Sequence, residues 1–113
     1  MPGVTWDELW GFVQTLPGCE RGTSYGTPSF KVKGKFMARL WEDGETLVLR
    51  IDFETVDVLL KSNPDVFFIT DHYVGYPAVL VRLRKADFEE LSELLETSWR
   101  LLATKKLIAE YDG

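Results

Sequence analysis

Residues 36–51 read FMARLWEDGETLVLRI, and this segment carries the strongest structural signal in the chain. Asp43-Gly44 separates two runs of alternating apolar residues, a pattern that predicts a β-hairpin with a type I′ turn. The register set by this turn places three apolar pairs on one face: Leu40 with Leu47, Ala38 with Leu49, and Phe36 with Ile51. The opposite face carries Met37, Arg39, Trp41, Thr46, Val48 and Arg50. We expect the first face to line the core, because a slip of one residue would exchange the two faces.

Toward the N-terminus, a helix and short extended segments precede this hairpin. Thr5 and Glu8 form a T-x-x-E capping box, and apolar residues then recur at helical spacing until Leu16-Pro17-Gly18 ends the helix. Glycines separate the extended segments, which are predicted at residues 22–25, 29–33 and 35–41. The last of these is the first arm of the hairpin.

Toward the C-terminus, a short helix and two strands follow the hairpin. Asp52 is predicted to cap the helix, and Asn63-Pro64 ends it. Strands are predicted at residues 66–70 and 78–84, on either side of a loop at 71–77. The second strand alternates, with Val79, Val81 and Leu83 predicted inward and Leu80, Arg82 and Arg84 outward.

The chain ends in two predicted helices, which complete an α+β order of elements. Asp87 and Glu90 cap a long amphipathic helix, and Thr104 caps a last short one. With 113 residues and 45% hydrophobic content, residues 1–113 are predicted to form a single domain with one core. Helices and antiparallel strands that follow one another in this way define the α+β class.

Acidic residues are largely absent from the predicted strands. The chain has 18 acidic and 13 basic side chains and a formal net charge of −5, yet residues 21–41 hold no Asp or Glu. Five basic residues lie in that range, and residues 72–86 form a second acid-free range with three more. An acidic chain can therefore still present a local basic surface to an anion, because the field depends on the arrangement of charges.

The scarcity of histidine and cysteine restricts the chemistry of the chain. His72 follows Asp71, but no nucleophile stands in a recognisable motif, so we predict no enzymatic activity. Cys19 is the only cysteine, and neither a phosphate-binding nor a calcium-binding loop motif occurs, so we predict no metal or cofactor. No apolar run approaches the roughly 18 residues of a membrane span, and no signal pattern opens the chain. We expect a cytoplasmic protein with no membrane partner.

The outward face of the sheet is the candidate binding surface. Its predicted anion- or nucleic-acid-binding residues are Lys31, Lys33, Arg39, Trp41, Arg50, Arg82 and Arg84. Basic side chains among aromatic ones suit phosphates and stacked bases. Two alternatives stay open. In the first, the C-terminal helix covers this face, so that Met37, Trp41, Val48 and Leu80 belong to the core. In the second, a protein partner or a second copy of the chain buries Met37, Trp41 and Val48.

Several short motifs, taken in order, resemble the MmcQ/YjbR family. These are TPSFKV at 27–32, GKFMA at 34–38, LRID at 49–52 and SWRLL at 98–102, with the loop at 72–77 fitting as well. The resemblance covers the chain from Trp6 to about Leu107. It implies a compact α-β-α domain similar to CyaY-like folds, with a curved antiparallel sheet of about five to six strands flanked by an N-terminal helix and C-terminal helices.

The family is usually labelled DNA-binding, because its sheet resembles a "double wing" DNA-binding motif. The resemblance thus predicts a non-enzymatic DNA-binding protein that uses the basic sheet face, and it brings no catalytic residues. A protein-interaction or homodimerising domain without a nucleic-acid role is the alternative.

Overall fold

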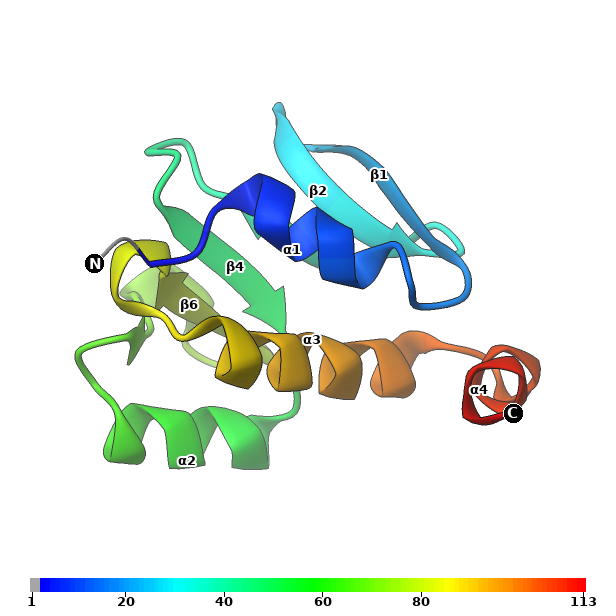
Figure 1. The fold of residues 1–113 in the computed structure, drawn as a ribbon. Coiled ribbons are helices and arrows are strands. Elements are labelled where there is room, and N and C mark those ends of the chain that lie inside the picture. Colours follow the sequence, from blue (N-terminus) through cyan, green and yellow to red (C-terminus); the bar gives the residue numbers. More distant parts are fainter. Residues whose placement is uncertain (1–2) are drawn as a thin grey trace.

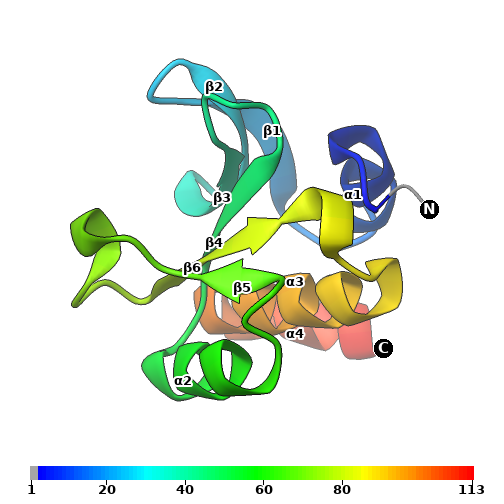
Figure 2. The same ribbon diagram turned by 90° about the vertical axis from the view of Figure 1, so that its left-hand side faces the viewer.

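A six-stranded antiparallel sheet forms the centre of the computed structural model, which describes residues 3–113 (Figure 1). The strands are β1 (Cys19–Ser24), β2 (Thr27–Val32), β3 (Lys35–Leu40), β4 (Thr46–Arg50), β5 (Phe67–Phe68) and β6 (Ala78–Arg82). They lie in the order β1-β2-β3-β4-β6-β5, and the sheet twists strongly from one edge to the other (Figure 2). The helices are α1 (Trp6–Val13), α2 (Phe53–Ser62), α3 (Phe88–Leu102) and α4 (Lys105–Asp112). The predicted α+β class and curved antiparallel sheet are confirmed.

All four helices contribute to one core on one face of the sheet. Leu9 of α1 and Leu95 and Trp99 of α3 are fully buried against the inward side chains of the strands. The remaining helices add Val56, Leu59 and Leu107 to the same cluster. Figures 1 and 2 show these helices on that side, and none of the described helices crosses the opposite face. The opposite face is therefore left for other elements to cover.

The helix starts follow the predicted capping residues. The Thr5 hydroxyl accepts a hydrogen bond from the Glu8 N–H while the Glu8 carboxylate accepts one from the Thr5 N–H, which completes the capping box. Asp52, Asp87 and Thr104 each accept a hydrogen bond from a backbone N–H three residues further on. Such side chains satisfy N–H groups that have no partner within the helix, so these boundaries are set locally.

Some strand boundaries differ from the predicted ones. β1 begins at Cys19 rather than at residue 22, and the strand predicted at 66–70 shrinks to β5. β6 ends at Arg82, and a 3₁₀ turn, η2 (Leu83–Lys85), replaces the predicted end of that strand. A second 3₁₀ turn, η1 (Asp71–Tyr73), lies in the loop before β6.

The β3–β4 hairpin has the predicted register but a different turn. Leu40 pairs with Leu47 and Ala38 with Leu49. A type I′ turn needs positive φ at both central residues, whereas here Gly44 has φ +72° and Asp43 is not in that region. The Gly44 N–H donates to the Trp41 carbonyl at 2.9 Å, so the loop is longer than two residues. The register is still the predicted one, because this longer loop is centred on the same pair of residues, Asp43 and Gly44.

Type I′ geometry occurs instead in the two tight hairpins that precede it. Tyr25-Gly26 joins β1 to β2 with φ values of 54° and 80°, and Lys33-Gly34 joins β2 to β3 with 49° and 82°. In both turns glycine takes the second position, where a positive φ carries no steric penalty. Tyrosine and lysine are uncommon at the first position, and for this reason the sequence pattern did not reveal these turns.

A β-bulge in β3 reverses two predicted side-chain directions. Phe30 pairs with Ala38 and Lys31 pairs with Phe36, so Met37 is an extra residue without a partner on β2. The bulge turns Met37 into the main core, where it is fully buried, and moves Phe36 to the opposite face. The predictions of an inward Phe36 and an outward Met37 were therefore wrong, because one inserted residue changes the alternation that a strand otherwise keeps.

A small apolar cluster lies on the outward face of the sheet. Val48, Ala78 and Leu80 are buried there, under the half-buried side chains of Phe36, Trp41, Phe68 and Tyr73. Val48 and Leu80 are thus core residues, as one alternative predicted. Aromatic side chains cover them, however, and the C-terminal helix packs on the other face.

Replacing Asp43 by alanine is expected to lower the free energy of unfolding by about 1 kcal/mol at neutral pH. The carboxylate accepts hydrogen bonds from the N–H groups of Glu45 and Thr46 and from the Thr46 hydroxyl. Partial burial raises the pKa of Asp43, but these hydrogen bonds outweigh it and hold the pKa below its ordinary value. Its contribution is therefore complete above the unfolded-state pKa of about 3.9 and is lost as pH falls through the lower folded-state pKa.

Urea unfolding of the natural chain and of Asp43→Ala across this acidic range measures that contribution. Asp43→Asn is the matched control, because an amide oxygen still accepts hydrogen bonds but does not titrate in this range. A difference between the natural chain and Asp43→Ala that stayed constant down to strongly acidic pH would contradict the role given to the carboxylate.

Candidate functional site: a basic and aromatic cavity on the open sheet face

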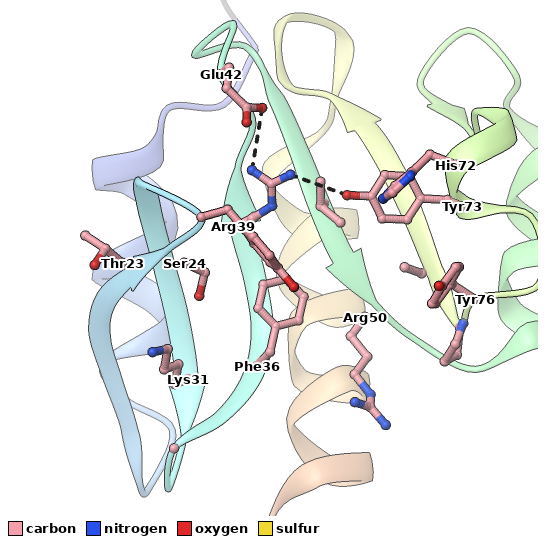
Figure 3. A pocket seen from close by; sticks show the side chains of 15 residues that line it. Thr23, Ser24, Lys31, Phe36, Arg39, Glu42, Arg50, His72, Tyr73 and Tyr76 are labelled. Carbon is pink, nitrogen blue, oxygen red and sulfur yellow. Dashed lines mark hydrogen bonds and ion pairs between the residues drawn. The ribbon is translucent and has the colours of Figure 1, made fainter.

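A cavity of about 880 Å³ opens on the face of the sheet that carries none of the described α-helices. One wall comes from the β1–β2 hairpin and the other from the loop between β5 and β6, with β3 and β4 between them (Figure 3). Its lining is mainly aromatic and basic, with Tyr25, Phe36, His72, Tyr73 and Tyr76 beside Lys31, Arg39 and Arg50. Among the described residues that line it, Glu42 is the one carboxylate.

The loop wall is held together by short-range contacts. The Tyr73 N–H donates to the Thr70 carbonyl, and the Tyr76 N–H donates to the Tyr73 carbonyl. Gly75, with φ +87°, lets the chain turn back toward β6. The rings of His72, Tyr73 and Tyr76 pack with centroid separations between 4.9 and 6.4 Å. These contacts place a group of three rings along one side of the cavity.

Arg39 is the central polar group of the cavity. The residue comes from β3 and is only 7% exposed, and its Nη2 donates to the Tyr73 hydroxyl at 3.4 Å. Nη1 donates to the Thr27 hydroxyl at 3.2 Å and lies 3.6 Å from a carboxylate oxygen of Glu42 (Figure 3). The guanidinium carbon also lies 5.2 Å from the centroid of the Tyr25 ring. Arg39 thus contacts both walls through long hydrogen bonds, and the carboxylate nearest to it is exposed.

The structure divides the seven predicted site residues. Three of them, Lys31, Arg39 and Arg50, line the cavity together. Trp41 is half-buried and packs against the apolar cluster below the cavity. The other three do not line the cavity. They are Lys33 in the β2–β3 turn, Arg82, whose guanidinium lies 4.1 Å from the centre of the Phe68 ring, and Arg84, which pairs with Glu45 at 2.7 Å.

The aromatic lining was absent from the sequence-based site. Tyr25 and the loop rings enter the cavity because two segments far apart in the chain face one another across β3 and β4. One available signal was the concentration of aromatic residues at 72–76, a loop in which no core face explains them. A second signal was a tyrosine directly before the turn glycine Gly26.

The residues considered for catalysis do not form a reactive group in the described structure. Burial raises the pKa of Cys19 to about 12, and the neighbouring Glu20 adds to the rise, so its thiol stays protonated at neutral pH. His72 is exposed and packs against tyrosine rings. Within residues 3–113, no three His, Cys, Asp or Glu side chains are grouped as metal ligands would be. None of the helices in that range is both long and apolar enough to cross a membrane.

Two of the three residues named for the protein-partner alternative are not available on the folded chain, while Trp41 is half-buried. Met37 is fully buried in the main core, and Val48 is 1% exposed beneath the aromatic side chains of the outward cluster. The bulge in β3 and the covering rings account for this difference, because both remove side chains that simple alternation would expose.

Comparisons with known proteins agree with this architecture. The chain is 26% identical to the protein DR2400 of Deinococcus radiodurans, whose crystal structure contains a DUF419 domain, with a TM-score of 0.77. That alignment covers 99% of this chain and 91% of the other.

Uncharacterised proteins of Mycobacterium bovis and Mycobacterium tuberculosis are 38% identical over 69 residues. The match takes in 60% of this chain and 54% of theirs, so the chain spans about half the length of these curated relatives. The YjbR family model matches residues 14–101, which include every strand and most of α3. The chain therefore belongs to the YjbR family.

Proposed function

We propose that the chain is a non-enzymatic DNA-binding protein and that the cavity is its DNA-binding site. The observation that carries this proposal is the buried guanidinium of Arg39. Removing a charge from water costs several kcal/mol unless close partners compensate it. The contacts of Arg39 are 3.2 Å or longer, and its nearest acid, Glu42, has a side chain that is 66% exposed. A phosphate oxygen would give this guanidinium the charged, short hydrogen bonds that it lacks.

The surrounding charges favour the same ligand. Lys31 and Arg50 add two positive charges to that of Arg39, while Glu42 supplies one negative charge. The whole chain carries −5, so its other surfaces repel a polyanion. Binding should then depend on a few phosphate contacts and weaken steeply with salt. With three basic contacts, we expect the slope of log K against log salt concentration to lie between about −2 and −3.

Replacing Lys31 and Arg50 together by glutamine is expected to weaken DNA binding about tenfold at moderate salt and to make the salt slope shallower by about 1.5. Fluorescence anisotropy with a labelled oligonucleotide, measured over a series of salt concentrations, gives both quantities. The matched control is Lys33→Gln with Arg84→Gln, which removes the same charge from positions outside the cavity.

Equal losses in the two double variants would contradict the proposal, because they would show that total charge and not the cavity governs binding. No measurable binding by the natural chain at low salt would contradict it more directly. Circular dichroism of each variant confirms that the fold is retained.

A further inference from the structure

Tyr25 has an unusual position for a large aromatic residue. It is 85% exposed and takes φ +54° as the first residue of the β1–β2 turn. Asparagine, aspartate and glycine suit this backbone conformation, whereas a bulky side chain there is uncommon. One face of its ring lies toward the Arg39 guanidinium, 5.2 Å from the ring centroid. A ring so exposed adds little to the core, and its free surface lies at the rim of the cavity.

The opposite wall offers a second exposed ring. Tyr76 is 60% exposed and lines the cavity next to Tyr73, whose hydroxyl accepts a hydrogen bond from Arg39. Figure 3 shows Tyr73 and Tyr76 on the side of the cavity that faces Lys31. The cavity that contains Arg39 therefore has an exposed aromatic ring on each of its two walls.

We infer that the cavity takes one unpaired nucleotide of single-stranded DNA, with its phosphate on Arg39 and its base stacked on Tyr25. This inference rests on the proposed function and names the form of DNA. Tyr25 and Arg39 are close enough for one nucleotide to reach both, and 880 Å³ lies within the size range of small-ligand pockets. In a duplex, each base face is already covered by its neighbours, so an aromatic side chain stacks readily only on an unpaired base.

Binding of a labelled single strand and of the matching duplex, measured by fluorescence anisotropy at the same salt concentration, tests the inference. The natural chain is expected to bind the single strand at least about tenfold more tightly, since a stacked base contributes that order of affinity. A deoxynucleoside monophosphate should compete at lower concentration than inorganic phosphate does, because only the nucleotide also contacts the ring.

Tyr25→Asn separates the role of the ring from the stability of the turn. Asparagine tolerates the positive φ, so the thermal unfolding midpoint should stay the same or rise. Affinity for the single strand should fall by about five- to one-hundredfold, the effect of losing one stacked base. Tyr25→Phe should bind as the natural chain does. The matched control is Val74→Ala, which removes an exposed apolar side chain from the same loop as Tyr76 but outside the cavity.

Two outcomes would overturn the inference while leaving the proposed function intact. These are equal affinity for single strand and duplex, and unchanged single-strand affinity in Tyr25→Asn. Failure of the proposed function looks different, because the natural chain would then bind neither form of DNA.

Discussion

Replacing Arg39 by methionine is expected to weaken DNA binding by about a hundredfold or more with little effect on the stability of the fold. Truncating one partner of a buried, hydrogen-bonded charge pair costs about 2–5 kcal/mol of binding energy. The stability of the free protein should respond differently. Exchanging a buried ion for an apolar side chain of similar size is often neutral or stabilising, because the cost of desolvating the charge disappears.

The neighbours of Arg39 support this separation of binding from stability. The Thr27 hydroxyl also donates to the Ser24 carbonyl, so it keeps a hydrogen bond in the variant. Tyr73 is half-buried and lines the cavity, so we expect a water molecule to replace the guanidinium at its hydroxyl group. We therefore expect the free energy of unfolding of Arg39→Met to be within about 1 kcal/mol of the natural value or above it.

Anisotropy and urea unfolding of the same preparations measure the two effects. Arg82→Met is the matched control, since Arg82 lies on the same sheet face but outside the cavity. Binding by Arg39→Met at the natural affinity would show that the guanidinium has only a structural role. A large loss of stability would show that its hydrogen bonds hold the two walls together.

Replacing Trp99 by alanine is expected to lower the free energy of unfolding by about 3–5 kcal/mol, the largest stability effect of any change considered. Trp99 is fully buried, and its indole N–H donates to the Pro17 carbonyl at 2.8 Å. The variant loses the apolar contacts of the largest core side chain and leaves that carbonyl without its donor. In a domain of this size, the thermal midpoint should fall by roughly 15 °C or more.

Two further variants divide this effect into its parts. Trp99→Phe keeps most of the apolar contact but removes the donor, so a loss of about 1–3 kcal/mol is expected. Leu101→Ala lies on the same helix but removes a side chain that is 56% exposed, and it should cost well under 1 kcal/mol. Denaturant unfolding followed by circular dichroism compares the three. Equal losses in Trp99→Ala and Leu101→Ala would contradict this account of the core.

The elements that sequence analysis predicted correctly depend on neighbours in the chain. Each capping residue bonds a backbone N–H three residues away, and the hairpin register follows from two alternating runs on either side of one turn. Interactions of this range are visible in a short window of sequence. The error at Met37 has another origin, since the bulge exists only through the pairing of β3 with β2.

The candidate site was predicted in part for the same reason. Lys31, Arg39 and Arg50 were placed on one face by alternation, and the cavity contains all three. Lys33 and Arg84 were placed there by extending the same alternation into a turn and into η2, where a period of two no longer applies. The aromatic lining was not predicted, because nothing in the local pattern of residues 71–77 shows that this loop lies opposite the β1–β2 hairpin.

Local chemistry in the chain sets the helix ends, the central register and the separation of basic strands from acidic helices. These features rest on hydrogen bonds and side-chain periodicity within a few residues, which the order of amino acids contains directly. Tertiary packing alone places a buried guanidinium between tyrosines from two distant segments, because that arrangement needs the curved sheet to bring residues 25, 39 and 73 together. The charge pattern therefore identifies a basic face, and the fold converts part of that face into a cavity.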